Sequence, residues 1–265
     1  MPACQANGRA RVGRQGRARR GMSRRLIGLP ELEDLAIGAA VLGTGGGGDP
    51  YVGKLWAQGR IHARGPVELI DADDLADDDL VIAAAMMGAP SVIVEKIPNG
   101  AELVAAFQAV EQACEARAAA VMCIEAGGIN STIPFALAAD LGLPVVDADG
   151  MGRAFPEVQM VSFAAYGLPA TPMAIADEHG NVTLLRTTSA EWAERLGRAL
   201  VVAEGGASVL AQYPLRGLDF KRTAIRGTLS LALEIGAGLR GAGRQGNVAI
   251  ESLTHRLRGA VIFHG

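Results

Sequence analysis

The segment that decides the fold is residues 120–149, which read AVMCIEAGGINSTIPFALAADLGLPVVDAD. Ala120 to Ile124 is a short apolar run of the kind that forms a buried strand, and Asn130 to Leu141 has apolar residues at helical spacing. Leu143 to Val146 is a second apolar run. A strand, a helix and a strand at this spacing predict a right-handed parallel crossover, which is the building unit of α/β proteins.

The segments on either side of this crossover predict more elements of the same kind. Helices are expected over 29–42, 50–59, 100–117, 189–204 and 228–239, and strands over 67–70, 80–86 and 259–263. The stretch 172–187 holds two short apolar runs around the turn Glu178-His179-Gly180-Asn181, which predicts an antiparallel hairpin. We therefore expect an α/β fold with a mixed, partly parallel sheet and flanking helices.

The charge distribution argues against nucleic-acid binding by the body of the chain. Residues 1–25 hold eight of the 25 basic residues and none of the 28 acidic ones, so the rest of the chain is strongly acidic. An acidic surface repels phosphate backbones. A segment whose charges are all positive and that has no apolar periodicity is typical of a disordered, dispensable extension. Met22 lies inside this segment and is an alternative first residue of the protein.

The sequence contains nothing typical of secretion or membrane insertion. Its three cysteines, Cys4, Cys114 and Cys123, are too few and too widely spaced for a disulfide framework or a zinc site. Each apolar run is interrupted by Gly, Asp or Pro before it reaches the roughly 20 residues that a membrane span needs. We expect a cytoplasmic protein with no membrane partner.

A glycine-rich loop joins the first two predicted helices. Gly43 to Gly48 matches the pattern GxGxxG, but it follows a helix, whereas the dinucleotide-binding fold requires a strand before this loop. The loop can still bind a ligand in another way. Gly45, Gly46, Gly47 and Gly48 allow backbone N–H groups to approach a ligand closely, and the N-terminus of the next helix, which Asp49 is expected to cap, lies beside them. The loop could bind an anion or a polarised carbonyl, or it could be a flexible connection.

Polar side chains follow the two strands of the crossover. Glu125 and Asn130 come after the first strand, and a second group, Asp147, Asp149, Arg153 and Glu157, comes after the next. Because ligands of open α/β sheets bind outside the carboxyl ends of the strands, these side chains are expected to converge. Carboxylates there can act as general bases or hold a divalent metal, although Asp147 and Asp149 could simply cap a turn.

We also expect the glycine loop and the carboxylates to share one pocket. Strand alternation would point Asp147 and Asp149 the same way. Two buried carboxylates need a cation, Arg153 or a raised pKa beside them. Cys123 has no histidine nearby in sequence, so a small buried side chain is favoured over a nucleophile, and no histidine pair has metal-binding spacing.

Three motifs together resemble a known family. They are residues 39–51 (AAVLGTGGGGDPY), 86–90 (MMGAP) and 145–157 (VVDADGMGRAFPE). From about Leu29 to Gly265 the chain resembles a family long catalogued as a domain of unknown function and now linked to S-methyl thiohydantoin desulfurase, with some members labelled hydantoinase-like or oxoprolinase-like. The resemblance implies a hydrolase that converts an S-methylated thiohydantoin to a hydantoin and methanethiol, in the catabolism of sulfur-containing histidine derivatives.

The resemblance also implies a domain division. Residues 1–25 would be the basic extension, 26–258 the N-terminal α/β domain, and 259–265 the start of a truncated C-terminal β-domain. An apolar strand that ends the chain would leave an exposed edge, so a homo-oligomer is expected. From their chemistry and expected position, Asp147, Asp149 or Glu125 would activate water, directly or through a metal. The small-molecule substrate would be bound by Gly45 to Gly48, Asp49, Asn130, Arg153 and Glu157. Two alternatives stay open: a non-catalytic ligand-binding or partner subunit of a hydantoinase-like system, and an inactive truncated member.

Overall fold

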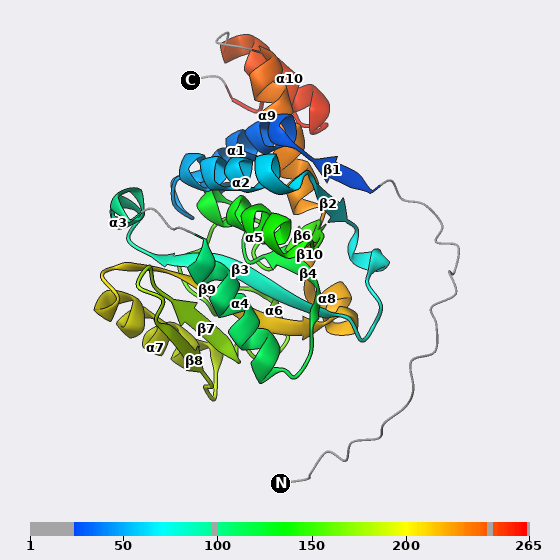
Figure 1. Ribbon diagram of the computed structural model, residues 1–265. Coiled ribbons are helices and arrows are strands. Elements are labelled where there is room, and N and C mark those ends of the chain that lie inside the picture. Colours follow the sequence, from blue (N-terminus) through cyan, green and yellow to red (C-terminus); the bar gives the residue numbers. More distant parts are fainter. Residues whose placement is uncertain (1–23, 97–99, 243–245, 264–265) are drawn as a thin grey trace.

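The computed structural model describes residues 24–96, 100–242 and 246–263 (Figure 1). Most of the basic extension therefore lies outside the described residues. Within them, eight strands form one sheet in the order β1-β2-β5-β4-β3-β9-β7-β8. The strands are β1 (Arg25–Ile27), β2 (Val67–Ile70), β3 (Leu80–Gly88), β4 (Ala118–Cys123), β5 (Val145–Val146), β7 (Met173–Ala176), β8 (Val182–Leu185) and β9 (Ala207–Arg216).

The sheet is mixed, as the sequence predicts. Strands β2, β5, β4 and β3 pair in parallel, and β4 and β5 are the two strands of the predicted crossover. Strand β1 adds an antiparallel edge beside β2, and β9, β7 and β8 continue the sheet beyond β3 with antiparallel pairings. The carboxyl ends of β3 and β4 therefore lie side by side at one edge of the sheet.

Helices cover both faces of the sheet and form a further layer above one of them (Figure 1). The helices are α1 (Leu29–Gly43), α2 (Pro50–Arg64), α3 (Pro90–Glu95), α4 (Ala101–Ala113), α5 (Ile133–Leu141), α6 (Ser162–Ala165), α7 (Ala190–Ala203), α8 (Gly217–Thr223), α9 (Thr228–Ala242) and α10 (Gly246–Arg256), with short 3₁₀ turns η1 (Ala72–Asp74) and η2 (Gly128–Ser131). Helices α4 and α5 pack on one face of the sheet, and α7 and α8 pack on the other. Helix α2 lies against α5, and α1 lies between α2 and α9.

Each face of the sheet buries its own apolar core. Leu103, Phe107 and Phe135 lie in the core under α4 and α5. On the other face, Phe163 packs against Tyr213 and Phe220 with ring centroids 5.5 and 6.0 Å apart. Two cores on a shared sheet are the ordinary way in which an α/β protein with few aromatic residues buries enough apolar surface.

Helices α1 and α9 approach closely because each has a glycine at the contact. A Cβ atom built on Gly38 would lie 1.8 Å from the carbonyl oxygen of Ala232, and one built on Gly236 would lie 1.7 Å from that of Asp34. No side chain can be accommodated at such distances. The arginine at the end of α9, Arg240, also forms an ion pair with Asp34 at 2.6 Å, so that the late helix α9 is fixed to the first helix of the chain.

The long strand β9 is an element that the sequence pattern missed. Pro214 interrupts the apolar run, and a proline argues against a central strand because it cannot donate a ladder hydrogen bond. In the structure the register between β3 and β9 shifts between Val81 and Ala83, where Tyr213 and Pro214 of β9 stand opposite the single residue Ile82 of β3. The proline is thus accommodated in a bulge.

The end of the described chain differs from the expectation. Residues 259–263, predicted as a strand, have no regular secondary structure, and they follow α10, which the sequence analysis did not predict. Strand formation needs a pairing partner, and no described strand lies beside this segment. Ile262 and Phe263 are 97% and 80% exposed. The homo-oligomer inferred from that strand stays a prediction.

Candidate functional site

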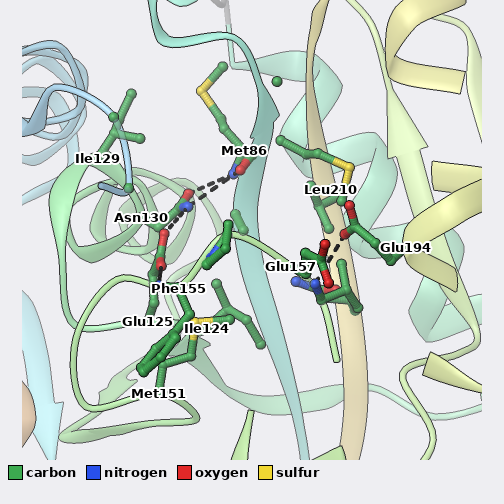
Figure 2. Close-up of a pocket in the computed structure, with 18 of the residues that line it drawn as sticks. Met86, Ile124, Glu125, Ile129, Asn130, Met151, Phe155, Glu157, Glu194 and Leu210 are labelled. Atoms are coloured by element: carbon green, nitrogen blue, oxygen red, sulfur yellow. Dashed lines mark hydrogen bonds between the residues drawn. The ribbon is translucent and has the colours of Figure 1, made fainter. Parts of the chain in front are cut away.

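A cavity of about 260 Å³ lies at the carboxyl ends of β3 and β4. Its lining combines apolar and polar side chains from segments far apart in the sequence, which Figure 2 shows in close-up. The polar lining residues are Glu125, Asn130, Glu157, Glu194, Arg198 and Gln212, and the apolar ones include Met86, Met87, Ile124, Ile129, Met151, Phe155, Val158 and Leu210. This edge of the sheet is where the sequence places a ligand site.

Glu125 is the most perturbed acid in the cavity lining. Its side chain is 3% exposed, and its carboxylate accepts hydrogen bonds from Asn130 Nδ2 at 2.6 Å and from the Phe155 N–H at 3.0 Å. Burial raises the pKa of Glu125 from 4.5 to about 7, against the opposing effect of those two donors and with a smaller contribution from the negative charge of Asp149. A carboxyl with this pKa can accept or donate a proton near neutral pH.

Asn130 fixes Glu125 relative to strand β3. Its Oδ1 accepts a hydrogen bond from the Met86 N–H at 2.7 Å, and its Nδ2 donates to Glu125 (Figure 2). Asn130 lies in the 3₁₀ turn η2 and is 7% exposed. Because the same amide contacts the ends of two strands, it ties the position of the carboxylate to the sheet itself.

Two glycines of the predicted loop reach the cavity. Gly47 and Gly48 line it, and the Gly47 carbonyl accepts a hydrogen bond from the Ile129 N–H at 2.8 Å. Gly47 has φ +74°, and a Cβ there would lie 2.6 Å from the Gly127 carbonyl oxygen and 3.1 Å from Glu125 Oε1. The absence of a side chain therefore allows the loop to pack directly beside the Glu125 carboxylate.

The segment 151–158 covers the cavity and is held from the other face of the sheet. The Glu194 carboxylate of α7 accepts a hydrogen bond from the Val158 N–H at 3.0 Å and is paired with Arg198 at 2.6 Å. Arg198 also donates to the Pro156 carbonyl at 3.2 Å, and the Tyr213 hydroxyl donates to the Val158 carbonyl at 2.9 Å. Glu157, predicted to bind substrate, lines the cavity within this segment.

The sequence analysis missed Glu194, Arg198 and Gln212. Glu194 and Arg198 read as the polar face of an amphipathic helix, and Gln212 lies in the strand that Pro214 concealed. The placement of β9 beside β3 brings Gln212 to the cavity, and the packing of α7 on β3, β7 and β9 brings Glu194 and Arg198 there. A glutamine inside an otherwise apolar run was the one local signal, since buried strands seldom contain an amide.

Asp149 lies behind Glu125 rather than in the cavity lining. It is fully buried, and its Oδ2 accepts hydrogen bonds from the backbone N–H groups of Ala126 at 2.7 Å, Met151 at 3.0 Å and Gly152 at 2.7 Å. Burial raises its pKa from 3.8 to about 6, against these donors. The buried hydroxyl of Thr228 lies near the carboxylate, but neither it nor Oδ1 has a partner of hydrogen-bonding geometry in the described chain.

Asp147 and Asp149 do not point the same way, contrary to the alternation argument. The chain leaves the large sheet after β5 and enters a two-stranded sheet of β6 (Ala148–Asp149) and β10 (Ile225–Arg226), so no continuous strand runs through both. Asp147 instead caps α9: its Oδ1 accepts from the N–H groups of Leu229 and Ser230, both at 3.0 Å. This carboxylate therefore serves as the N-terminal cap of the helix.

The remaining predicted residues lie away from the cavity. Asp49 is exposed and caps α2 through the Tyr51 N–H at 2.8 Å. Gly45 and Gly46 are also exposed and belong to the outer part of the loop. Arg153 is exposed with its guanidinium 4.9 Å from the centre of the Phe155 ring, so it does not neutralise Asp149.

Two further questions from the sequence concern metals and the buried cysteine. Across residues 24–96, 100–242 and 246–263, no three His, Cys, Asp or Glu side chains gather in a way that could hold a metal ion. Both oxygens of Glu125 and one oxygen of Asp149 accept hydrogen bonds from N–H donors, and they do not converge on one point. Cys123 is fully buried, and burial raises the pKa of its thiol, which fits a packing role.

Comparison with known families divides the chain into two adjoining matches. The S-Me-THD-like N-terminal domain matches residues 30–187, and the S-Me-THD-like C-terminal domain matches residues 188–265. The chain belongs to the S-methyl thiohydantoin desulfurase-like family. The second match begins at residue 188, well before the position 259 expected for the C-terminal domain. In this family member, the cavity is thus built from both matched regions, with Glu125 in the first and Gln212 in the second.

A solved structure supports the same fold. The chain is similar to the crystal structure of a protein from Chromobacterium violaceum, with 30% sequence identity and a TM-score of 0.79 over 88% of this chain and 66% of that chain. This chain therefore matches somewhat less than two thirds of the length of that protein. A search of curated proteins finds no match. No helix in the part of the chain that the structure describes is both long and apolar enough to cross a membrane.

Proposed function

We propose that this protein is a hydrolase that converts an S-methylated thiohydantoin and water to a hydantoin and methanethiol, with Glu125 as the general base. The observation that carries the proposal is the buried Glu125 carboxyl, with a pKa of about 7, in the lining of a cavity at the carboxyl ends of two parallel strands. The family, as its name indicates, includes proteins resembling S-methyl thiohydantoin desulfurase. The cavity of about 260 Å³ suits a small ring, because pockets for drug-sized ligands are roughly 300–1,000 Å³.

The reaction needs a group that moves protons twice. Water attacks the ring carbon that carries sulfur: its oxygen bonds to that carbon while the double bond from that carbon to the neighbouring ring nitrogen opens, and Glu125 takes one water proton and passes it to this nitrogen. The tetrahedral intermediate then collapses: the carbon–sulfur bond breaks, the hydroxyl becomes a carbonyl, and the hydroxyl proton leaves with the sulfur as methanethiol. A carboxyl titrating near neutral pH can accept and return a proton in each step.

The surroundings of Glu125 favour this use over a purely structural one. A buried carboxylate that only stabilised the fold would be expected to have a full set of donors or a cation as its partner. Glu125 has two donors and no cation among its described hydrogen bonds, and burial dominates its pKa. Strongly perturbed acids in a cavity are candidate catalytic groups.

The test is the release of methanethiol from an S-methylated thiohydantoin by the purified protein. Glu125→Gln should lower kcat by about 10²- to 10⁴-fold, the usual contribution of a general base. Glu111→Gln is a matched control, because Glu111 is also buried, at 7% exposure, but does not line this cavity. Equal rates for the wild type and Glu125→Gln would overturn the role of Glu125.

The same experiment separates a hydrolase from a ligand-binding subunit. A binding subunit would show an increase in melting temperature with the ring compounds but would release no methanethiol. Turnover by the wild-type protein therefore supports the enzyme, whereas ligand-induced stabilisation without turnover supports the binding subunit and contradicts the proposed reaction.

A further inference from the structure

The cavity wall formed by β9 contains a buried amide whose oxygen has no hydrogen-bond partner. Gln212 is 2% exposed and lines the cavity, and among the described residues nothing donates to its Oε1. A buried amide oxygen without a partner is costly, and such groups in folded proteins generally need an explanation. Strand β3 lies between β9 and β4, so Gln212 approaches the cavity from a different side than Glu125.

The backbone of β9 is irregular directly beside Gln212. The bulge in β9 follows Gln212 immediately, and Tyr213 within it has φ +48°, which is uncommon for a residue other than glycine. Bulges redirect side chains and occur often beside active sites. The Tyr213 hydroxyl in turn holds the Val158 carbonyl at 2.9 Å, so the same bulge positions both Gln212 and the segment that covers the cavity.

The other polar groups on this wall already have partners. Glu194 is bound by Arg198 and by the Val158 N–H, and Glu157 accepts a hydrogen bond from the Gln159 amide. Gln212 is therefore the group on this wall whose hydrogen-bonding capacity is left for a ligand. Its amide carries a C=O acceptor and an NH₂ donor side by side, and the two ends can exchange by rotation.

We propose that Gln212 binds the lactam edge of the five-membered ring, pairing its amide with a ring N–H and the adjacent ring C=O. This assignment rests on the proposed function, because it takes the ligand to be a hydantoin-type ring. Two parallel hydrogen bonds fix a planar ring in one orientation, and so Gln212 determines that the carbon bearing sulfur faces Glu125. Substituents on the ring nitrogen next to the carbonyl are excluded, because they remove the donor and occupy its place.

The experiment compares binding of hydantoin with binding of hydantoin methylated on the ring nitrogen between its two carbonyls. Isothermal calorimetry is done on the wild-type chain, on Gln212→Leu, which removes both polar atoms, and on Gln212→Glu, which keeps only acceptors at pH 8. Ser208→Ala is the matched control, because Ser208 is on the same strand, 4% exposed, and not part of this cavity lining. Methanethiol release from the corresponding S-methylated thiohydantoins is measured in parallel.

The wild type and Ser208→Ala should bind hydantoin about 10- to 100-fold more tightly than the methylated ring, the effect of two lost hydrogen bonds. Gln212→Leu should bind both rings weakly and alike. If Gln212→Leu does not fold, the preference of the wild type and its reduction in Gln212→Glu decide the question. A wild type that binds neither ring or binds both equally, or a Gln212 variant that keeps the preference, overturns the assignment.

The two proposals fail separately. If hydantoin binding depends on Gln212 but no methanethiol is released, Gln212 recognises the ring and the proposed reaction is wrong. If methanethiol is released and the Gln212 variants keep both the wild-type kcat/KM and the preference for the unmethylated ring, the reaction stands and the assignment of Gln212 is wrong.

Discussion

Replacing Glu125 by glutamine should change how the stability of the protein depends on pH. The fold raises the pKa of Glu125 from 4.5 to about 7, chiefly by burial. Between those two values the folded chain binds a proton at this site that the unfolded chain has lost, so the free energy of unfolding falls as pH rises. The stabilisation of the protonated form is fully present below about pH 4.5 and is lost as pH rises through about 7.

The size of the effect follows from the pKa difference. At 1.36 kcal/mol for each unit of pKa, the change from 4.5 to about 7 corresponds to roughly 3 kcal/mol. Because the side chain is only 3% exposed, solvent screening reduces this little. Glu125→Gln has no proton to lose, and its disturbed hydrogen bonds to Asn130 and to the Phe155 N–H add a cost that does not vary with pH.

The assay is urea denaturation of the wild type and Glu125→Gln at several values between about pH 4 and pH 8. The difference between the two free energies of unfolding should shift in favour of the variant by roughly 3 kcal/mol over this range. Asp149 is present in both proteins, so its own titration largely cancels. Two parallel stability curves would refute the reasoning, because they would mean that Glu125 titrates alike in the folded and unfolded chains.

Three further predictions concern residues outside the cavity lining. Gly38→Ala should lower the free energy of unfolding by about 2–3 kcal/mol, because a Cβ there would lie 1.8 Å from a carbonyl oxygen of α9. Gly59→Ala has open space around the new atom and should stabilise helix α2 by about 0.5–1 kcal/mol. Melting temperatures of the two variants check both predictions. Asp149→Ala should cost about 3 kcal/mol or more in urea denaturation because it leaves three backbone N–H groups without their acceptor, and Asp149→Asn, which keeps an oxygen there, should cost less than half as much. Asp147→Ala should cost about 1–2 kcal/mol through loss of the α9 cap and leave kcat within twofold, so a large loss of turnover would return Asp147 to the active site.

The part of the site that the sequence predicts is the part built by one parallel crossover. Glu125 and Asn130 are within a few residues of the end of β4, and the rule that ligands bind beyond the carboxyl ends of parallel strands needs only the identity of that strand. The prediction for the glycine loop was less specific. A run of glycines indicates that the backbone can come close to another group, but it does not identify that group. The structure shows that Gly47 and Gly48 reach the cavity and Gly45 and Gly46 do not.

The rest of the site depends on the order of strands in the sheet, which local patterns do not contain. Gln212 and Glu194 come to the cavity because β9 lies beside β3, and a proline in the bulge made β9 unrecognisable as a central strand. The alternation argument for Asp147 failed for a related reason. Alternation holds only along one strand, and the chain changes sheets at that residue.

The perturbed pKa of Glu125 is itself a product of this non-local assembly. Burial is its largest cause, and part of the cover over Glu125 is the segment 151–158, which supplies the Phe155 N–H as one of its two donors. That segment is held in place by Glu194 and Arg198 of α7 and by the Tyr213 hydroxyl of β9. The base and the segment that covers it both come from the region that matches the N-terminal domain of the family, but the side chains that hold this segment in place come from the region that matches the C-terminal domain. The chemistry of Glu125 therefore depends on contacts between the two matched regions and cannot be assigned to either one alone.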